Sequence, residues 1–192
     1  ANLVIWFAAP GTMNDGARFA ELKARYPNAD IVGCSTGGEI VADEVLDQSV
    51  VATAVRFDKT RTKVAVTDVS AGGDSQEAGR KLAEELQASD INNVFVLSDG
   101  INVNGSELVR GFRSVIGDEV PLTGGLAGDG ADFGTTYVGC NDVPSPMRVV
   151  AVGFYGDALT IGHGSVGGWD TFGPQRTITR SDGNVLFELD GQ

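Results

Sequence analysis

Basic clusters, long apolar runs and cysteine pairs are all scarce in this sequence of 192 residues. Its 14 Lys and Arg residues are scattered among 26 Asp and Glu residues, which gives a net charge of −12. A nucleic-acid backbone would be repelled by this charge, because no basic patch compensates for it. We therefore expect no nucleic-acid partner.

Apolar runs are interrupted by Lys, Arg, Asp, Glu or Gly within about eight residues, whereas a membrane helix needs about 20. This argues against membrane insertion. The chain starts in a strand-like run, residues 2–9, without the basic segment or cleavage site of a secretory signal. Its only cysteines, Cys34 and Cys140, have no CxxC spacing, which argues against a disulfide scaffold, a zinc site or a redox motif. These features predict a cytoplasmic protein.

Apolar periodicity predicts strands that alternate with helices. Two hairpins are expected, one formed by residues 49–56 and 62–69, the other by residues 148–155 and 158–165 across a Gly156-Asp157 turn. Helices are expected after Thr12 or Asn14, after Asp74 or Ser75, and after Asn104 or Ser106. Further strands are predicted at residues 3–8, 31–32, 94–97, 121–123, 175–180 and 185–189.

The order of elements repeats within the chain. Residues 1–72 and 91–166 each read as a strand, a helix, a short strand, a glycine-rich turn and a hairpin, which suggests two pseudo-repeated β-α-β-β-β halves. The fold class that follows is mixed α/β, with mixed β-sheets flanked by outer helices in a sandwich-like αββα architecture. We treat residues 1–192 as one domain.

Two glycine-rich turns follow short apolar strands. We call residues 33–39 (GCSTGGE) the first elbow and residues 124–130 (GGLAGDG) the second elbow. Adjacent glycines let backbone N–H groups approach a ligand, although a sharp turn alone also requires them. Neither elbow is a dinucleotide-binding or phosphate-loop motif. If the halves are related by a pseudo-twofold axis, the elbows face each other across a cleft.

Several side chains near these turns have alternative interpretations. Cys34 paired with His163, the single histidine, would give a Cys-dependent hydrolase or transferase. His163 between two glycines would also suit a haem iron. Asp99, Asp129 and Asp132 can hold a cation or an ammonium group, but an Asp in a glycine-rich turn usually bonds its own backbone.

The sequence resembles the N-terminal domain of the FIST family of sensory proteins. The resemblance spans nearly the whole chain and is most specific in IVGCSTGGEI (31–40), VLSDGINVNG (96–105), the second elbow and GPQRTITRSDGNVLFELDG (173–191). It implies a prokaryotic, cytoplasmic module that senses small molecules such as amino acids. Such modules work with histidine kinases, chemotaxis receptors or cyclic-dinucleotide enzymes, and some related proteins are haem-containing nitric oxide sensors. FIST proteins normally continue into a C-terminal domain, and this chain stops at Gln192.

The leading hypothesis is a non-enzymatic sensor without a metal or cofactor, which binds a small polar metabolite between the two elbows. The alternatives are a haem-based nitric oxide sensor, the Cys-dependent enzyme, and a scaffold that only relays a partner's signal. The ligand-binding residues that we expect are Cys34, Ser35, Thr36, Gly37, Asp99, Gly124, Gly125, Asp129, His163 and Trp169.

Overall fold

The computed structural model describes residues 1–70, 73–164, 166–167, 170–182 and 185–192. The chain divides into a unit of residues Ala1–Ile161 and a second unit of residues Gly162–Gln192. In the described part of the chain, no helix has both the length and the apolar character that crossing a membrane requires.

Two four-stranded sheets form the centre of the first unit. In one, the order β5-β1-β2-β9 places parallel β1 and β2 between two antiparallel neighbours. In the other, the order is β6-β10-β7-β8, and only β7 and β8 are parallel. The strands are β1 (Leu3–Ala8), β2 (Asp30–Ser35), β5 (Val50–Val55), β6 (Arg61–Asp68), β7 (Ile91–Ser98), β8 (Leu122–Leu126), β9 (Val138–Cys140) and β10 (Arg148–Tyr155).

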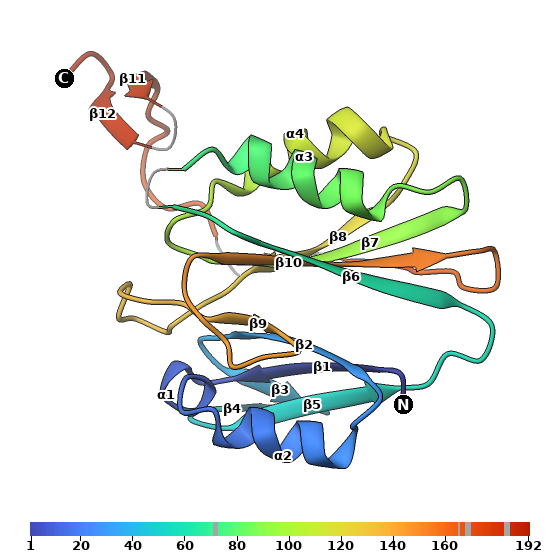
Figure 1. Cartoon of the computed structure of the whole chain (residues 1–192). Coiled ribbons are helices and arrows are strands. Elements are labelled where there is room, and N and C mark those ends of the chain that lie inside the picture. The colour runs from blue at the N-terminus through green and yellow to red at the C-terminus, as the bar shows by residue number, and fades with distance from the viewer. Residues whose placement is uncertain (71–72, 165, 168–169, 183–184) are drawn as a thin grey trace. The chain divides into compact units, whose positions relative to one another are not determined.

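Helices cover the outer face of each sheet, so the unit has four layers (Figure 1). α1 (Pro10–Met13) and α2 (Ala17–Arg25) lie outside the first sheet, and α3 (Ser75–Leu86) and α4 (Gly105–Ile116) lie outside the second. Buried side chains such as Val32, Leu97 and Val152 fill the space between the sheets. The predicted mixed fold with outer helices is confirmed.

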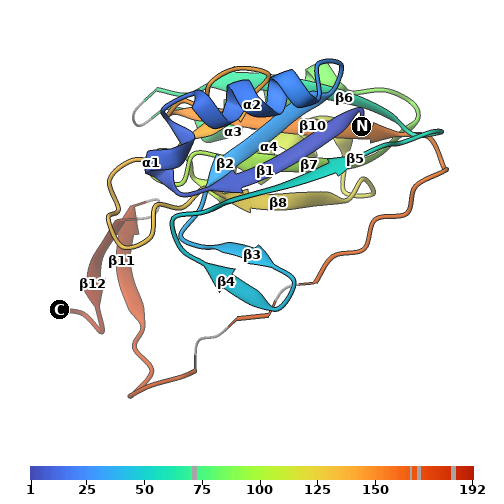
Figure 2. The same ribbon diagram turned by 90° about the horizontal axis from the view of Figure 1, so that it is seen from below.

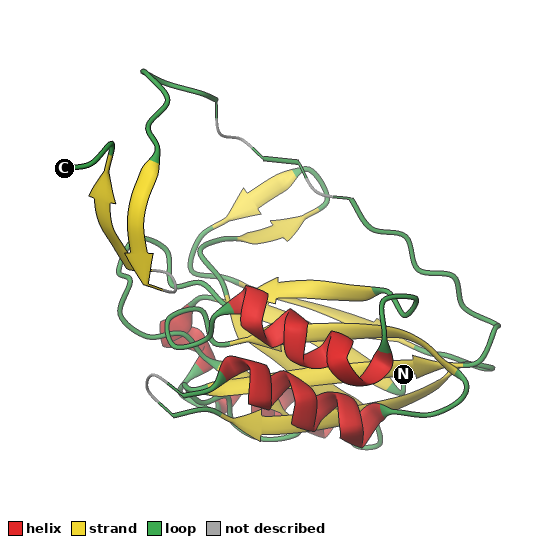
Figure 3. Ribbon diagram, turned by 90° about the horizontal axis from the view of Figure 1, so that it is seen from above, coloured by secondary structure: helices red, strands yellow, loops and turns green. Residues whose placement is uncertain are grey.

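Local sequence explains the helices of the second sheet. Asp74 caps α3 by accepting a hydrogen bond from Glu77 N, and Asn104 caps α4 in the same way for Glu107 N, as expected of side-chain N-caps. The two helices lie side by side across the sheet (Figure 3). Gly111 allows the two helices to approach closely, because a Cβ added at this position would lie 2.0 Å from Gln76 O.

The two expected hairpins are wrong. β5 pairs with β1 and β6 pairs with β10, so the loop after β5 crosses from one sheet to the other. Five loop residues span the roughly 10 Å between stacked sheets as readily as they close a hairpin, so the local sequence does not distinguish the two. β10 already has β6 and β7 as neighbours, and residues 158–164 form no strand.

A small hairpin that the sequence did not predict lies between the first elbow and β5. It consists of β3 (Glu39–Val41) and β4 (Glu44–Leu46). In Figure 2 it projects beyond the strands of the first unit on the side of β5 and β8. Its aliphatic side chains are exposed, including Ile40 and Val45.

The halves correspond in the way their strands pair. Each has two parallel strands joined through a helix, β1 with β2 and β7 with β8, and an antiparallel strand beside the first of them. The halves also exchange strands, because β6 joins the second sheet and β9 joins the first. The second unit contains β11 (Ile178–Asp182) and β12 (Val185–Leu189), which pair antiparallel.

Candidate functional site

The two elbows touch each other through their glycine backbones. Gly128 N donates a 2.9 Å hydrogen bond to Ser35 O. A Cβ added to Gly37 would lie 3.3 Å from the backbone of Gly130, so a larger residue at Gly37 would require the second elbow to adjust. The elbows therefore meet as the pseudo-symmetry predicts, but they are in contact rather than separated by a cleft.

A cavity of about 430 Å³ opens beside this contact. We call it the elbow cavity, and its size suits a small metabolite. Four carboxylate residues line it, and no Lys, Arg or His is among the described residues of its wall. The lining residues are Ala9, Pro10, Thr36, Gly37, Gly38, Glu39, Asp47, Gln48, Asp129, Gly130, Ala131 and Asp132.

Glu39 is fixed at the wall of the cavity where the first elbow enters β3. Thr36 Oγ1 donates to Glu39 Oε1 at 2.6 Å. Ser49 donates to Glu39 Oε2 from both its backbone N (3.1 Å) and its Oγ (2.7 Å). The carboxylate is almost fully buried, and these donors offset the loss of water. It therefore supplies fixed negative charge beside the cavity.

Asp129 at the tip of the second elbow fixes the loop that follows it. Its Oδ2 accepts hydrogen bonds from Gly134 N at 2.7 Å and Thr135 N at 3.0 Å. These bonds hold the turn that places Gly130 and Asp132 at the cavity wall. Asp129 thus has the backbone-binding role that is usual for Asp in a turn, and it also faces the cavity.

A family model, the FIST N domain, matches residues 2–192. The chain belongs to the FIST N-domain family. FIST domains are sensory domains implicated in signal transduction, and they are not known as a catalytic family. No curated protein matches the chain.

The end of β2 at Ser35 separates the three neighbouring residues that we expected at the ligand site of this FIST N domain, because Cys34 and Ser35 lie within the strand and Thr36 lies beyond it. Cys34 points into the core between the sheets. Ser35 is fully buried, and its Oγ accepts a hydrogen bond from Tyr137 N at 2.9 Å. Thr36 alone of the three lines the elbow cavity, together with Gly37.

Burial makes both thiols poor nucleophiles. It raises the pKa of Cys34 to about 12. The pKa of Cys140 is also raised to about 12, first by burial and then by the charges of Asp30 and Asp142. Because the thiolate is the reactive form, the environment of Cys34 argues against a Cys-dependent enzyme.

We expect thiol labelling to follow this burial. At pH 8, Ellman's reagent will label Cys34 and Cys140 much more slowly than free cysteine, because their raised pKa leaves little thiolate and both side chains are buried. Both will react once urea unfolds the protein. The single-cysteine variants Cys34→Ala and Cys140→Ala assign the rates. Fast labelling of Cys34 in the native state would contradict the buried geometry.

Asp99 binds its own loop. Its Oδ1 accepts hydrogen bonds from Ile101 N and Asn102 N, and its Oδ2 accepts one from Met147 N. Burial alone would raise the pKa of Asp99, but these hydrogen bonds outweigh it and hold the pKa below its ordinary value. The elbow cavity does not include Asp99 among its described wall residues.

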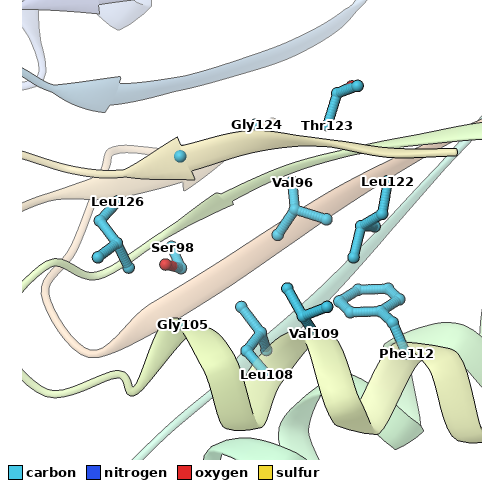
Figure 4. A pocket seen from close by; sticks show the side chains of 11 residues that line it. Val96, Ser98, Gly105, Leu108, Val109, Phe112, Leu122, Thr123, Gly124 and Leu126 are labelled. Carbon is cyan, nitrogen blue, oxygen red and sulfur yellow. The ribbon is translucent and has the colours of Figure 1, made fainter. Parts of the chain in front are cut away.

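Gly124 and Gly125 lie on β8 and line a different cavity, of about 150 Å³. We call it the edge pocket. It lies between the end of the sheet at β8 and helix α4, and Figure 4 shows Leu108, Val109 and Phe112 facing the strands across it. The second elbow therefore has two parts. Residues 124–126 belong to β8, and residues 128–130 lie beside the first elbow, which Gly128 contacts through its hydrogen bond to Ser35.

His163 belongs to the second unit and is exposed. Haem sites enclose the porphyrin among apolar side chains, and an exposed imidazole does not fit that requirement, so we derive no function through haem. Trp169 lies outside the described residues.

Three polar residues of the elbow cavity were not predicted as ligand contacts. Glu39 stands in the first elbow motif, so its position was available from the sequence. Asp47 and Gln48 precede β5, and only the return of the chain from the β3–β4 hairpin brings them to the cavity. No local pattern marks them.

Proposed function

We propose that this FIST N domain senses a small molecule with a cationic group, such as the ammonium of an amino acid, through the elbow cavity. The observation that supports the proposal is the set of carboxylates at the cavity, Glu39, Asp47, Asp129 and Asp132, with no cationic side chain in its described wall. An ammonium group gains charge-assisted hydrogen bonds from carboxylates. The hydroxyl of Thr36 adds a polar contact beside them.

The proposal includes the setting in which the domain works. We place it in the cytoplasm, beside or within a signalling partner such as a histidine kinase, a chemotaxis receptor or a cyclic-dinucleotide enzyme. The family's association with sensing and signal transduction supports this setting.

A thermal-shift screen tests the ligand class. Each common amino acid is added at about 10 mM beside its N-acetyl derivative, which lacks the ammonium. A ligand present at about 100 times its Kd stabilises the native state by about 2.7 kcal/mol, which raises the Tm of a domain of this size by about 5–10 °C. We expect at least one free amino acid to raise the Tm and its N-acetyl derivative not to.

The control compares two exposed carboxylates. Asp132→Asn removes a charge from the elbow cavity, whereas Asp157→Asn removes one from the exposed turn after β10. Only Asp132→Asn should weaken the ligand-induced shift. If no amino acid raises the Tm, or if the N-acetyl derivatives act equally, recognition of the ammonium in this cavity is wrong.

A further inference from the structure

We propose that the outer edge of β8 binds an extended segment of a partner protein, which adds a strand to the second sheet and places an apolar side chain in the edge pocket. The partner segment carries basic residues on either side of that side chain. This inference does not depend on which molecule binds in the elbow cavity.

The backbone of β8 is available for such pairing. β8 ends the order β6-β10-β7-β8, and no described strand pairs with its outer side. Pro121 O and Ala127 N bond to β7. Because backbone groups alternate in direction along a strand, the N–H and C=O groups of Gly124 and Leu126 point outward. An added strand would satisfy them.

β8 also carries none of the charged side chains with which proteins often protect a free edge. Charged side chains, especially Lys, prevent unwanted pairing. The opposite edge of the same sheet, β6, carries Arg61, Lys63 and Asp68. β8 reads LTGGL and carries no charge. An uncharged edge that ends in a half-exposed Leu126 is expected where a partner strand covers it.

The edge pocket gives the added strand a specific contact. Its wall is largely apolar, with Leu108, Val109 and Phe112 on α4 opposite Leu122 and Leu126 on β8 (Figure 4). A volume of about 150 Å³ is enough for a group the size of benzene, so it suits one Leu, Ile or Phe side chain. Strand addition typically combines backbone pairing with such side-chain pockets.

Charge favours a basic partner over a second copy of this chain. Asp118 and Glu119 precede β8, and Asp129 and Asp132 follow it. Two copies paired antiparallel through β8 would bring these carboxylates opposite each other, which is unfavourable. Lys or Arg at both ends of a partner segment would instead meet opposite charge.

Fluorescence anisotropy with the full chain tests the proposal. The probe is a fluorescein-labelled peptide of about nine residues, with alternating Thr and Leu in the middle and two Lys at each end. One comparison peptide replaces every Lys by Glu, and another is N-methylated at alternate residues so that it cannot pair as a strand. We expect the Lys peptide to bind about tenfold or more tightly than either comparison peptide.

Variants at the two edges locate the binding. Leu126→Lys introduces a charge at the exposed mouth of the edge pocket and should weaken binding of the Lys peptide by about tenfold or more. Val66→Lys, at an exposed valine on β6, should leave it unchanged. The peptide should also slow hydrogen exchange at the amides of Gly124 and Leu126.

Equal binding of the three peptides, no binding of the Lys peptide, or binding unaffected by Leu126→Lys would overturn the proposal. A concentration-dependent dimer in sedimentation that Leu126→Lys abolishes would also overturn it, in favour of a second copy at this edge.

Discussion

Gly124→Ala should lower the free energy of unfolding by at least about 3 kcal/mol. Gly124 has a φ of 135°, which L side chains rarely adopt, and an added Cβ would lie 1.8 Å from Val96 O. β8 must then move away from β7. The strain of such a backbone conformation costs about 1–3 kcal/mol, and each lost hydrogen bond adds about 1 kcal/mol. Urea unfolding followed by far-UV circular dichroism measures the change.

The neighbouring glycine provides a matched control. A Cβ added to Gly125 meets no heavy atom within 4 Å. Gly125→Ala should therefore change the free energy of unfolding by no more than about 0.5 kcal/mol, the usual range for surface substitutions. Equal losses in the two variants would show that the close approach of β8 to β7 at Gly124 is not what requires glycine.

Asp99→Ala should cost about 3–5 kcal/mol of unfolding free energy. The substitution removes the acceptor of three backbone N–H groups, those of Ile101, Asn102 and Met147. An unsatisfied buried donor costs about 1–3 kcal/mol, and water that reaches the loop recovers part of this. Asp157→Ala, in an exposed turn, is the control and should be nearly neutral. A loss below about 1 kcal/mol for Asp99→Ala would contradict the role of its carboxylate.

The same carboxylate predicts a dependence on pH. The folded-state pKa of Asp99 lies below its ordinary value, whereas the unfolded chain has a pKa of about 3.9. The folded protein therefore holds the proton less tightly, and the stabilisation is complete above about pH 4 and lost as the pH falls toward the folded-state pKa. The difference in unfolding free energy between the wild type and Asp99→Asn should shrink over this acidic range. A constant difference would contradict the linkage.

The sequence predicted the layers of the fold better than the pairing of its strands. The periodicity of Ala78, Leu82 and Leu86 and the caps Asp74 and Asn104 specify helices locally, and the structure has them. Whether β5 and β6 form a hairpin depends on partners far away in the chain, β1 and β10. A five-residue connection carries no information about those partners.

Of the expected ligand-binding residues that the structure describes, Thr36, Gly37 and Asp129 line the elbow cavity. The two elbows touch each other, as their matching positions in the two halves of the chain suggested. Cys34, Ser35 and Thr36 were assigned to one wall, although successive residues of a strand point to opposite faces. This rule puts Cys34 and Ser35 on opposite faces of β2, so these two residues could not line one wall together. The position of Asp47 depends on tertiary structure alone.

The exchange of β6 and β9 between the two sheets also affects how the chain folds. β9 pairs with β2 across more than a hundred residues of sequence, and β10 pairs with β6 across 80 to 94 residues. Neither half can complete its own sheet, so an excised half would expose an unpaired strand and an open core. Because non-local pairing slows folding, we expect the first unit to fold slowly and cooperatively, with its second sheet completed only after β10 has been synthesised.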